Sequence, residues 1–416
     1  MKFTVPGLRS GWFYALLTAF IFMAGEAHAQ MVAVPPSPPG AEAFLARRNW
    51  FWAGEQVMTL MVPALILFSG LGARLRTLAT SFARGNAYGT VTLTAILFLI
   101  ISVVLGLPYE YWRGYASLGE MAPSLTGWAM QQGMGLLLRC AAAILFVWIP
   151  YALIRRSPRR WWLQAAAIAI PVTFVTLIAL PVWIDPITTS YRPLSDKALY
   201  AEIETLATRC GVANIPVFVG GHDTTVVGLG PTNRIILGED WFPNDAPEAL
   251  RFTVGHELKH YVMGDNYWSI AVICGVLLLG FFMVHLLGRA LISRFRVRFG
   301  FNDLADPASL PLGVLILTAS WLCVLPLFNW YGRHVEFEAD RFGLELTHDN
   351  YGLAQMEAGY INGGDVADWG PFFRIFRATH PTNGERIRFA NSYRPWERGE
   401  PLVYGEVCKP AGEVPR

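Results

Sequence analysis

The chain has 416 residues, of which 53% are hydrophobic and only 15% are charged, and its mean hydropathy is +0.36. A soluble enzyme of this size carries more charge and fewer apolar residues, so the composition excludes that class and indicates a protein embedded in a lipid bilayer. The formal net charge of +2 identifies no partner, and no basic, aromatic patch indicates nucleic-acid binding.

The first segment, residues 1–29, has the pattern of a bacterial export signal. Two basic residues precede an apolar run from Gly11 to Gly25, and Ala27-His28-Ala29 supplies the small residues typical of a cleavage site. An uncleaved signal anchor, which would add a membrane span, stays open as the alternative. Residues 30–56 follow as a linker that begins with a proline-rich stretch.

Six apolar stretches are long enough, or nearly so, for the roughly 20 residues that cross a bilayer as a helix. They lie near 57–72, 87–107, 134–154, 162–184, 267–288 and 309–330, and the first is the weakest. We therefore expect N-terminal transmembrane helices over 57–184 and a transmembrane hairpin over 267–330. Arg139 lies inside the third stretch, with Gln131 and Gln132 two turns before it, and either faces a water-filled chamber or reaches toward the lipid headgroups.

Arginine clusters occupy alternate connections between these stretches. They comprise Arg74, Arg76 and Arg84, then Arg155, Arg156, Arg159 and Arg160, then Arg289, Arg294, Arg296 and Arg298. Because cytoplasmic connections are enriched in basic residues, residues 185–266 and 331–395 should share the opposite, periplasmic side. The cytoplasmic face stays the alternative, because large soluble segments cross regardless of nearby charge. A bond between Cys210 and Cys408, which lie in the two soluble segments, is possible and would persist in the periplasm.

The first soluble segment, residues 185–266, is typical of a compact α+β unit. A helix is expected over Asp196–Cys210, followed by strands over Ile215–Val219, Thr224–Gly228 and Arg234–Leu237. An exposed edge strand of such a sheet could hold an extended peptide by main-chain hydrogen bonds. An ordinary structural sheet is an equally good interpretation of these strands.

The same segment ends with the motif His256-Glu257-Leu258-Lys259-His260. An expected helix, capped by Asp245 with Glu248 and ended by Gly264, places both imidazoles on one face, where they can bind one metal ion. A hydrolytic zinc site takes three protein ligands and leaves the fourth position to water. Glu257 is the candidate base that takes the proton of that water.

The second soluble segment, residues 331–395, supplies the third candidate ligand. A second helix is expected over Arg333–Leu346, where Glu336 can complete the zinc site. Asp340 lies one turn later and could accept the outer N–H of a bound histidine, or it could simply pair with Arg341. Residues 396–416 form a polar tail. The predicted cofactor is one zinc ion per chain.

These residues resemble the CaaX prenyl protease type 1-like family of integral-membrane metallopeptidases. The resemblance covers roughly residues 50 to 395 and rests on motifs in the family's order: Leu107-Pro108-Tyr109, Ser157 to Trp162, Asp185-Pro186, Tyr191 to Asp196, the zinc helix, Glu336 to Asp340, and His380-Pro381 with Glu385-Arg386.

The resemblance implies a zinc endopeptidase whose membrane helices surround a hydrophilic chamber. It implies His256, His260 and Glu336 as metal ligands and Glu257 as the catalytic base. It also implies that His380 lies near the zinc, where it could donate to the oxyanion or merely order its loop, and that Arg386 orders that loop. The family's Asn-Ala before the edge strand is replaced here around Asp223, so no role is assigned there.

The predicted fold class is therefore a mainly α, polytopic membrane protein, with six to seven transmembrane helices around a chamber and a small α+β zinc-peptidase domain. The predicted function is an integral-membrane zinc metalloendopeptidase of the bacterial inner membrane that acts on membrane-associated or misfolded polypeptides. Its partners are these polypeptides and the lipid bilayer. A catalytically inactive zinc-binding scaffold and a transporter-like protein are the alternatives.

Overall fold

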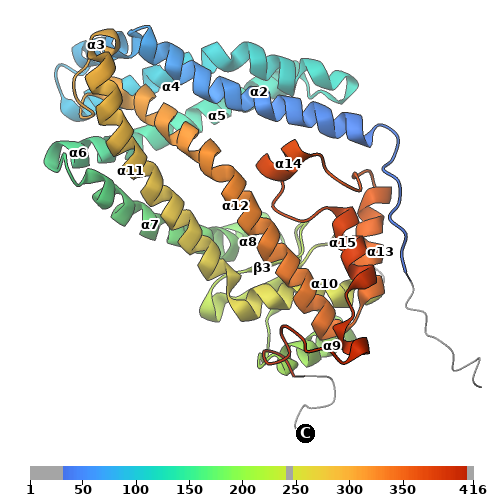
Figure 1. Cartoon of the computed structure of the whole chain (residues 1–416). Coiled ribbons are helices and arrows are strands. Elements are labelled where there is room, and N and C mark those ends of the chain that lie inside the picture. The colour runs from blue at the N-terminus through green and yellow to red at the C-terminus, as the bar shows by residue number, and fades with distance from the viewer. Residues whose placement is uncertain (1–30, 240–246, 410–416) are drawn as a thin grey trace, which may run out of the picture.

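The computed structural model describes residues 31–239 and 247–409 of the chain. The expected export signal, residues 1–29, and the Asp245 cap therefore lie outside the described residues. The molecule has a large helical part and a smaller mixed part at its lower end (Figure 1). The helical part contains α2 (Ala41–Phe68), α3 (Leu71–Phe82), α4 (Ala87–Gly114), α5 (Leu125–Phe146), α6 (Trp148–Arg156), α7 (Trp161–Ala179), α8 (Asp185–Thr188), α11 (Asp265–Phe299) and most of α12 (Leu310–Thr347).

Among the described residues, six helical segments have the length and apolar composition needed to cross a membrane. These are Ala41–Phe68, Ala87–Gly119, Leu125–Arg156, Trp161–Ile187, Asp265–Phe299 and Pro307–Thr347. The prediction of a polytopic, mainly helical membrane protein is confirmed.

The first of these segments differs from its predicted bounds. The apolar stretch was expected near 57–72, after a linker over 30–56, whereas α2 begins at Ala41 and ends at Phe68. Arg47, Arg48 and Glu55 interrupt the apolar run, but they are good helix formers and do not interrupt the helix.

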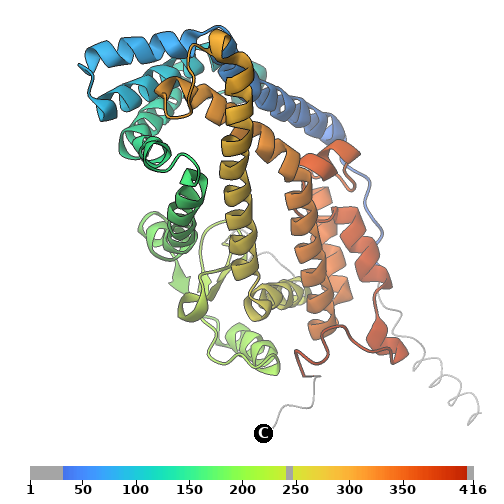
Figure 2. The same ribbon diagram turned by 60° about the vertical axis from the view of Figure 1, so that its left-hand side comes forward.

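The hairpin of α11 and α12 connects the two parts of the molecule. Both helices run from the helical part down to the mixed part, side by side (Figures 1 and 2). The expected separate helix over Arg333–Leu346 is wrong as a separate element, because α12 continues without a break from Leu310 to Thr347. Gly332 lies within it, where a Cβ atom would stand 3.1 Å from the carbonyl oxygen of Thr379. This glycine therefore marks a close approach of the 379–381 loop, and it does not end the helix.

Within the described residues, the mixed part contains a small sheet and five α-helices besides the end of α12. Its elements are β1 (Arg192–Pro193), α9 (Lys197–Arg209), β2 (Val217–Val219), β3 (Thr225–Val227), β4 (Arg234–Leu237), α10 (Pro247–Met263), α13 (Asn350–Asn362), α14 (Pro371–Phe376) and α15 (Asn383–Ser392). The strand order is β1-β2-β4-β3, in which only β2 and β4 are parallel. The predicted helix and three strands are confirmed, and β3 is an edge strand beside α10.

The core of the mixed part joins both soluble segments. Ile203 of α9, Val226 of β3, Leu258 of α10 and Phe342 of α12 belong to one buried apolar cluster. The same cluster contains the disulfide between Cys210 and Cys408, whose Cα atoms lie 4.1 Å apart. The pairing considered possible from the sequence is therefore present, and it attaches the C-terminal segment to α9.

A cavity of about 600 Å³ lies between α2, α4, α5 and α12 in the helical part. Glu55, Glu110 and Arg113 line it together with Gln131, Gln132 and Arg139. Arg139 of the third predicted span therefore faces a cavity together with the two glutamines of α5, which agrees with the first of the two orientations considered for it, because an ionised side chain exposed to lipid is costly.

Candidate metal centre

Helices α10 and α12 bring the three predicted metal ligands together. His256 and His260 lie one turn apart on α10, and Glu336 lies on α12. One candidate ligand atom from each residue lies within 4.8 Å of the other two. The two Nε2 atoms are 3.3 Å apart, and Glu336 Oε2 lies 3.2 Å from Nε2 of His256 and 3.9 Å from Nε2 of His260.

This donor set fits a zinc ion. Two imidazole nitrogens and one carboxylate oxygen are ligands that zinc accepts, and three protein ligands leave a coordination position free. The ammonium group of Lys259, the neighbour of His260 on α10, forms an ion pair with Asp265 at 2.7 Å. The site geometry therefore suits a single metal ion.

Each histidine has a carboxylate behind it. Nδ1 of His256 lies 2.9 Å from Oδ1 of Asp340, and Nδ1 of His260 lies 2.6 Å from Oδ2 of Asp265. Such contacts fix the ring orientation and leave Nε2 for the metal. Asp340 was predicted from the sequence for this position, whereas Asp265 was missed. Its signal was its place directly after Gly264, whose φ of 65° permits the sharp turn from α10 into α11.

Arg386 of α15 holds Asp340 from the other side. Its Nε atom donates to Oδ2 of Asp340 at 2.7 Å and its Nη2 atom donates to Oδ1 at 2.5 Å, while its Nη1 atom forms an ion pair with Glu357 of α13. Asp340 and Glu357 have no exposed surface. Arg386 thus joins α12, α13 and α15 behind the metal ligands, which is more than the loop-ordering role that the family resemblance implied.

The candidate base, Glu257, lies in the same buried region. Glu257 is 7% exposed, and together with His256 it lines a cavity of about 360 Å³. Burial raises the pKa of the Glu257 carboxyl, and the charges of His256 and His260, together with a hydrogen bond from the backbone of Val226 in β3, partly offset this effect. The edge strand therefore contacts the base directly.

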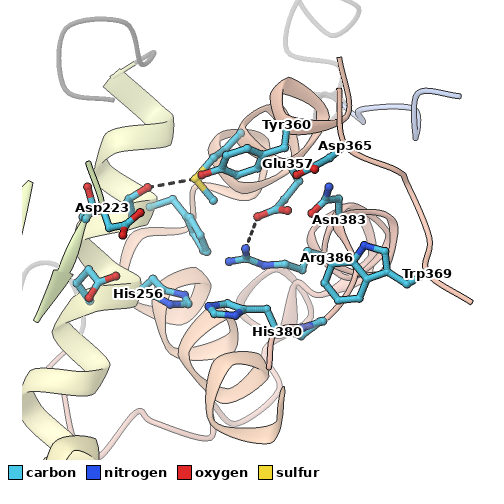
Figure 3. A pocket seen from close by; sticks show the side chains of 15 residues that line it. Asp223, His256, Glu357, Tyr360, Asp365, Trp369, His380, Asn383 and Arg386 are labelled. Carbon is cyan, nitrogen blue, oxygen red and sulfur yellow. Dashed lines mark hydrogen bonds and ion pairs between the residues drawn. The ribbon is translucent and has the colours of Figure 1, made fainter. Parts of the chain in front are cut away.

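His380 enters the site from the loop before α15. Its Nε2 atom lies 3.4 Å from Oε2 of Glu336, and its Nδ1 atom lies 3.1 Å from the hydroxyl of its neighbour Thr379. His380, His256 and Arg386 line the same cavity (Figure 3). The structure thus places His380 next to a candidate ligand.

The far wall of the cavity was not predicted from the sequence. It is formed by Met356 and Tyr360 of α13, by Asp365 and Trp369 in the following loop, and by Asn383 of α15 (Figure 3). Asp223, to which no role was assigned, lies on the opposite side of the opening (Figure 3). Apart from Asn383, which lies within the 380–386 motif, these residues belong to no motif, so only the fold reveals them.

Comparison with known proteins gives a consistent result. Residues 193–394 match the model of peptidase family M48, and residues 41–189 match the model of the CAAX prenyl protease N-terminal region with five membrane helices. The chain is 28% identical over 337 residues to the "Uncharacterized metalloprotease YhfN" of Bacillus subtilis, covering 78% of this chain and 79% of the relative. It is 24% identical over 304 residues to the "CAAX prenyl protease 1 homolog" of Dictyostelium discoideum, covering 69% of each.

The fold has a counterpart among solved structures. The crystal structure of S. mikatae Ste24p superposes with a TM-score of 0.64 at 17% sequence identity, covering 84% of this chain and 87% of the other. At this identity the superposition shows a similarity of fold alone. The similarity of sequence is shown by the matches to the two family models. The chain is therefore a member of the CAAX prenyl protease-like M48 family of membrane metalloproteases.

Proposed function

We propose that the chain is an integral-membrane zinc metalloendopeptidase that hydrolyses peptide bonds of membrane-associated or misfolded proteins. The observation that carries this proposal is the convergence of His256, His260 and Glu336 within 4.8 Å beside the buried carboxyl of Glu257. Membership of family M48 supports the same reaction class.

His256, His260 and Glu336 would hold the zinc ion. When bound, zinc supplies a positive charge that acidifies water and polarises a peptide carbonyl. Glu257 takes a proton from the attacking water and later transfers it to the nitrogen of the leaving amine. Asp340 and Asp265 keep the two imidazoles in the ligating orientation through their Nδ1 atoms.

His380 would act on the developing charge of the substrate. Its ring lies beside Glu336 at the opening of the cavity, from where a ring N–H can donate to the carbonyl oxygen that becomes negative. The competing role is to order the loop through Thr379. The two roles differ kinetically, since a group acting only in the transition state lowers kcat and kcat/KM together.

The proposed location is the bacterial inner membrane, with the metal centre on the outer, periplasmic face. Two observations support this orientation. The arginine clusters of the α6–α7 turn and the end of α11 lie at the end of the molecule opposite the metal centre (Figure 1). The disulfide Cys210–Cys408 lies at the metal-centre end, and disulfides persist in oxidising compartments.

The decisive experiment compares Glu257→Gln with Glu248→Gln. Both changes remove one carboxylate from α10, but only Glu257 lines the cavity. We expect Glu257→Gln to retain zinc, measured by elemental analysis, and to lose cleavage of an unstructured peptide, whereas Glu248→Gln stays active. A chelator should inhibit the wild type, and added zinc should restore activity.

Two results would reject the proposal. Cleavage by Glu257→Gln at the wild-type rate would show that this carboxylate is not the base. A wild-type protein that contains zinc yet cleaves no peptide, including membrane-protein fragments, would favour the zinc-binding scaffold.

The orientation is tested by cysteine labelling in whole cells. Lys197→Cys, at the start of α9, should react with a membrane-impermeant maleimide in intact spheroplasts, whereas Arg294→Cys in α11 should react only after lysis. The reverse pattern would place the metal centre in the cytoplasm.

A further inference from the structure

A second cavity lies at the end of the molecule opposite the metal centre. Its volume is about 680 Å³, and it is formed by the α6–α7 turn, the last turns of α11 and the loop that leads to α12. Three arginines line it, namely Arg159, Arg289 and Arg296, against one carboxylate, that of Asp303. None of the catalytic or metal-binding candidates reaches this region, so the proposed peptidase reaction does not explain it.

The charges in this cavity are open to a ligand. Within the part of the chain that the structure describes, no ion pair involves Arg159, Arg289 or Arg296. Asp303 uses a carboxylate oxygen to accept a hydrogen bond from the backbone N–H of Ala305 at 2.8 Å. Other charges at this end do have partners, since Arg76 pairs with Asp306 and Arg155 donates to the carbonyl oxygen of Ala305.

The walls of the cavity are part of the packed core of the helical part. Ile154, Trp161, Ile292 and Leu304 line it and belong to one buried apolar cluster of the helical part. The contact of Tyr151 with Ser309, at 3.3 Å between the two hydroxyl oxygens, further attaches α6 to the loop before α12. The arginines therefore line a pocket whose other walls are packed apolar side chains, and they differ in this from arginines scattered over a surface.

The position of the cavity matches the headgroup region of a bilayer. Helix α11 has 35 residues and is about 52 Å long, whereas the hydrocarbon core is about 30 Å thick. Its last turns, with Arg289 and Arg296, thus reach the polar interface, while apolar side chains on the same turns, Leu286, Leu287 and Val297, are exposed. A ligand here would meet guanidinium groups and a lipid-facing apolar surface together.

We propose that this arginine cavity binds the phosphate group of an anionic membrane lipid. Guanidinium groups form paired hydrogen bonds with phosphate oxygens, and basic pockets between transmembrane helices suit anionic headgroups. The acyl chains of the lipid would lie along the exposed apolar side chains of α11. The inference is independent of the peptidase activity, because it concerns other residues at the other end of the hairpin.

The test uses the purified full-length protein and native mass spectrometry with phosphatidylglycerol as the probe. The variant Arg159→Gln/Arg296→Gln removes two cavity arginines. The control Arg156→Gln/Arg294→Gln removes two arginines from the same helical region that do not line the cavity. We expect the first pair to weaken phosphatidylglycerol binding about thirty-fold, because each basic residue contributes about a factor of five, and the control to bind like the wild type.

Three outcomes would overturn the proposal. An equal loss in both pairs would indicate diffuse surface charge. Equal binding of phosphatidylcholine, whose phosphate is neutralised by choline, would contradict selectivity for an anionic lipid, and binding of inorganic phosphate as tight as that of the lipid would identify a soluble phosphate as the ligand. If the double variant does not fold, Arg289→Gln against Arg294→Gln makes the same comparison, with an expected loss of about five-fold.

Discussion

Charged side chains at the two ends of the α11–α12 hairpin differ in their burial and in their ion pairing. At the metal-centre end, Asp340 and Glu357 are completely buried, and both pair with Arg386. At the other end, Arg159 and Arg296 are exposed, and within the described residues neither has an ion-pair partner. A buried pair fixes the positions of its neighbours, whereas an open charge remains available to a ligand. The first arrangement suits an orienting framework, and the second suits recognition of an anion.

The strongest test of this comparison removes one arginine from each end. Arg386→Met should lower the free energy of unfolding by about 3–5 kcal/mol, because it leaves two buried carboxylates without their cation. Arg296→Met should change it by less than about 0.5 kcal/mol, because an exposed side chain is replaced. Denaturant titration in detergent measures both values. Similar losses at the two ends would contradict the distinction between paired and open charge.

The disulfide provides the next test, since it stabilises only the metal-centre end. Replacing Cys210 and Cys408 together by serine should cost about 2–4 kcal/mol, because the cross-link restricts the unfolded chain. The control is Cys140→Ser in α5, a free cysteine, which should have little effect. Thermal melting with and without a reductant gives the same comparison in the wild type. A melting temperature that is insensitive to reduction would argue against the contribution of the cross-link.

Asp265 tests whether the charges at the metal-centre end orient the ligands. Asp265→Asn should weaken zinc binding about 10-fold to 100-fold, because the ring of His260 loses its charged partner. Asp303→Asn, at the arginine end, should leave zinc affinity unchanged. Competition with a chromophoric chelator measures the affinity. An unchanged affinity in Asp265→Asn would mean that the ring of His260 is held by other contacts.

The smallest expected effect concerns an exposed ion pair near the metal centre. Asp368 accepts hydrogen bonds from Arg388 at 2.6 Å and from Thr382 at 2.7 Å, and the bond from Arg388 lowers the pKa of its carboxyl. A lowered pKa contributes stability at neutral pH that is lost as the pH falls below the ordinary value near 3.8. Because the pair is half-exposed, Asp368→Asn should cost no more than about 0.5 kcal/mol at pH 7. Melting curves of the two proteins should converge in acid, and a constant difference would contradict this assignment.

Features with a local signal in the sequence could be predicted. The spacing of His256 and His260, the apolar face of α9 and the short β-branched strands each depend on neighbouring residues, and the structure contains these elements close to their predicted bounds. The continuity of α12 could not be predicted, because a change from apolar to polar residues marks where a helix leaves the bilayer and not where it ends.

Features that depend on tertiary contacts were missed for a different reason. Glu357 has no motif, and only the packing of α13 against α15 brings it to Arg386. The strand β1 has two residues and contains Pro193, so it gives no periodic signal. The pairing of Cys210 with Cys408 was considered possible but could not be settled from the sequence, because it joins residues 198 positions apart, a separation over which sequence spacing carries no information.

Because α12 is continuous, a single helix carries both a membrane-spanning segment and the candidate metal ligand Glu336. Glu336 lies ten positions beyond Pro326, a distance of about 15 Å along the helix axis. A tilt of the span by a few degrees would therefore move the Glu336 carboxylate by about 1 Å relative to the imidazoles of α10. Helices tilt to match the thickness of the hydrocarbon. The lipid composition of the surrounding membrane would therefore change the position of Glu336 through the tilt of α12.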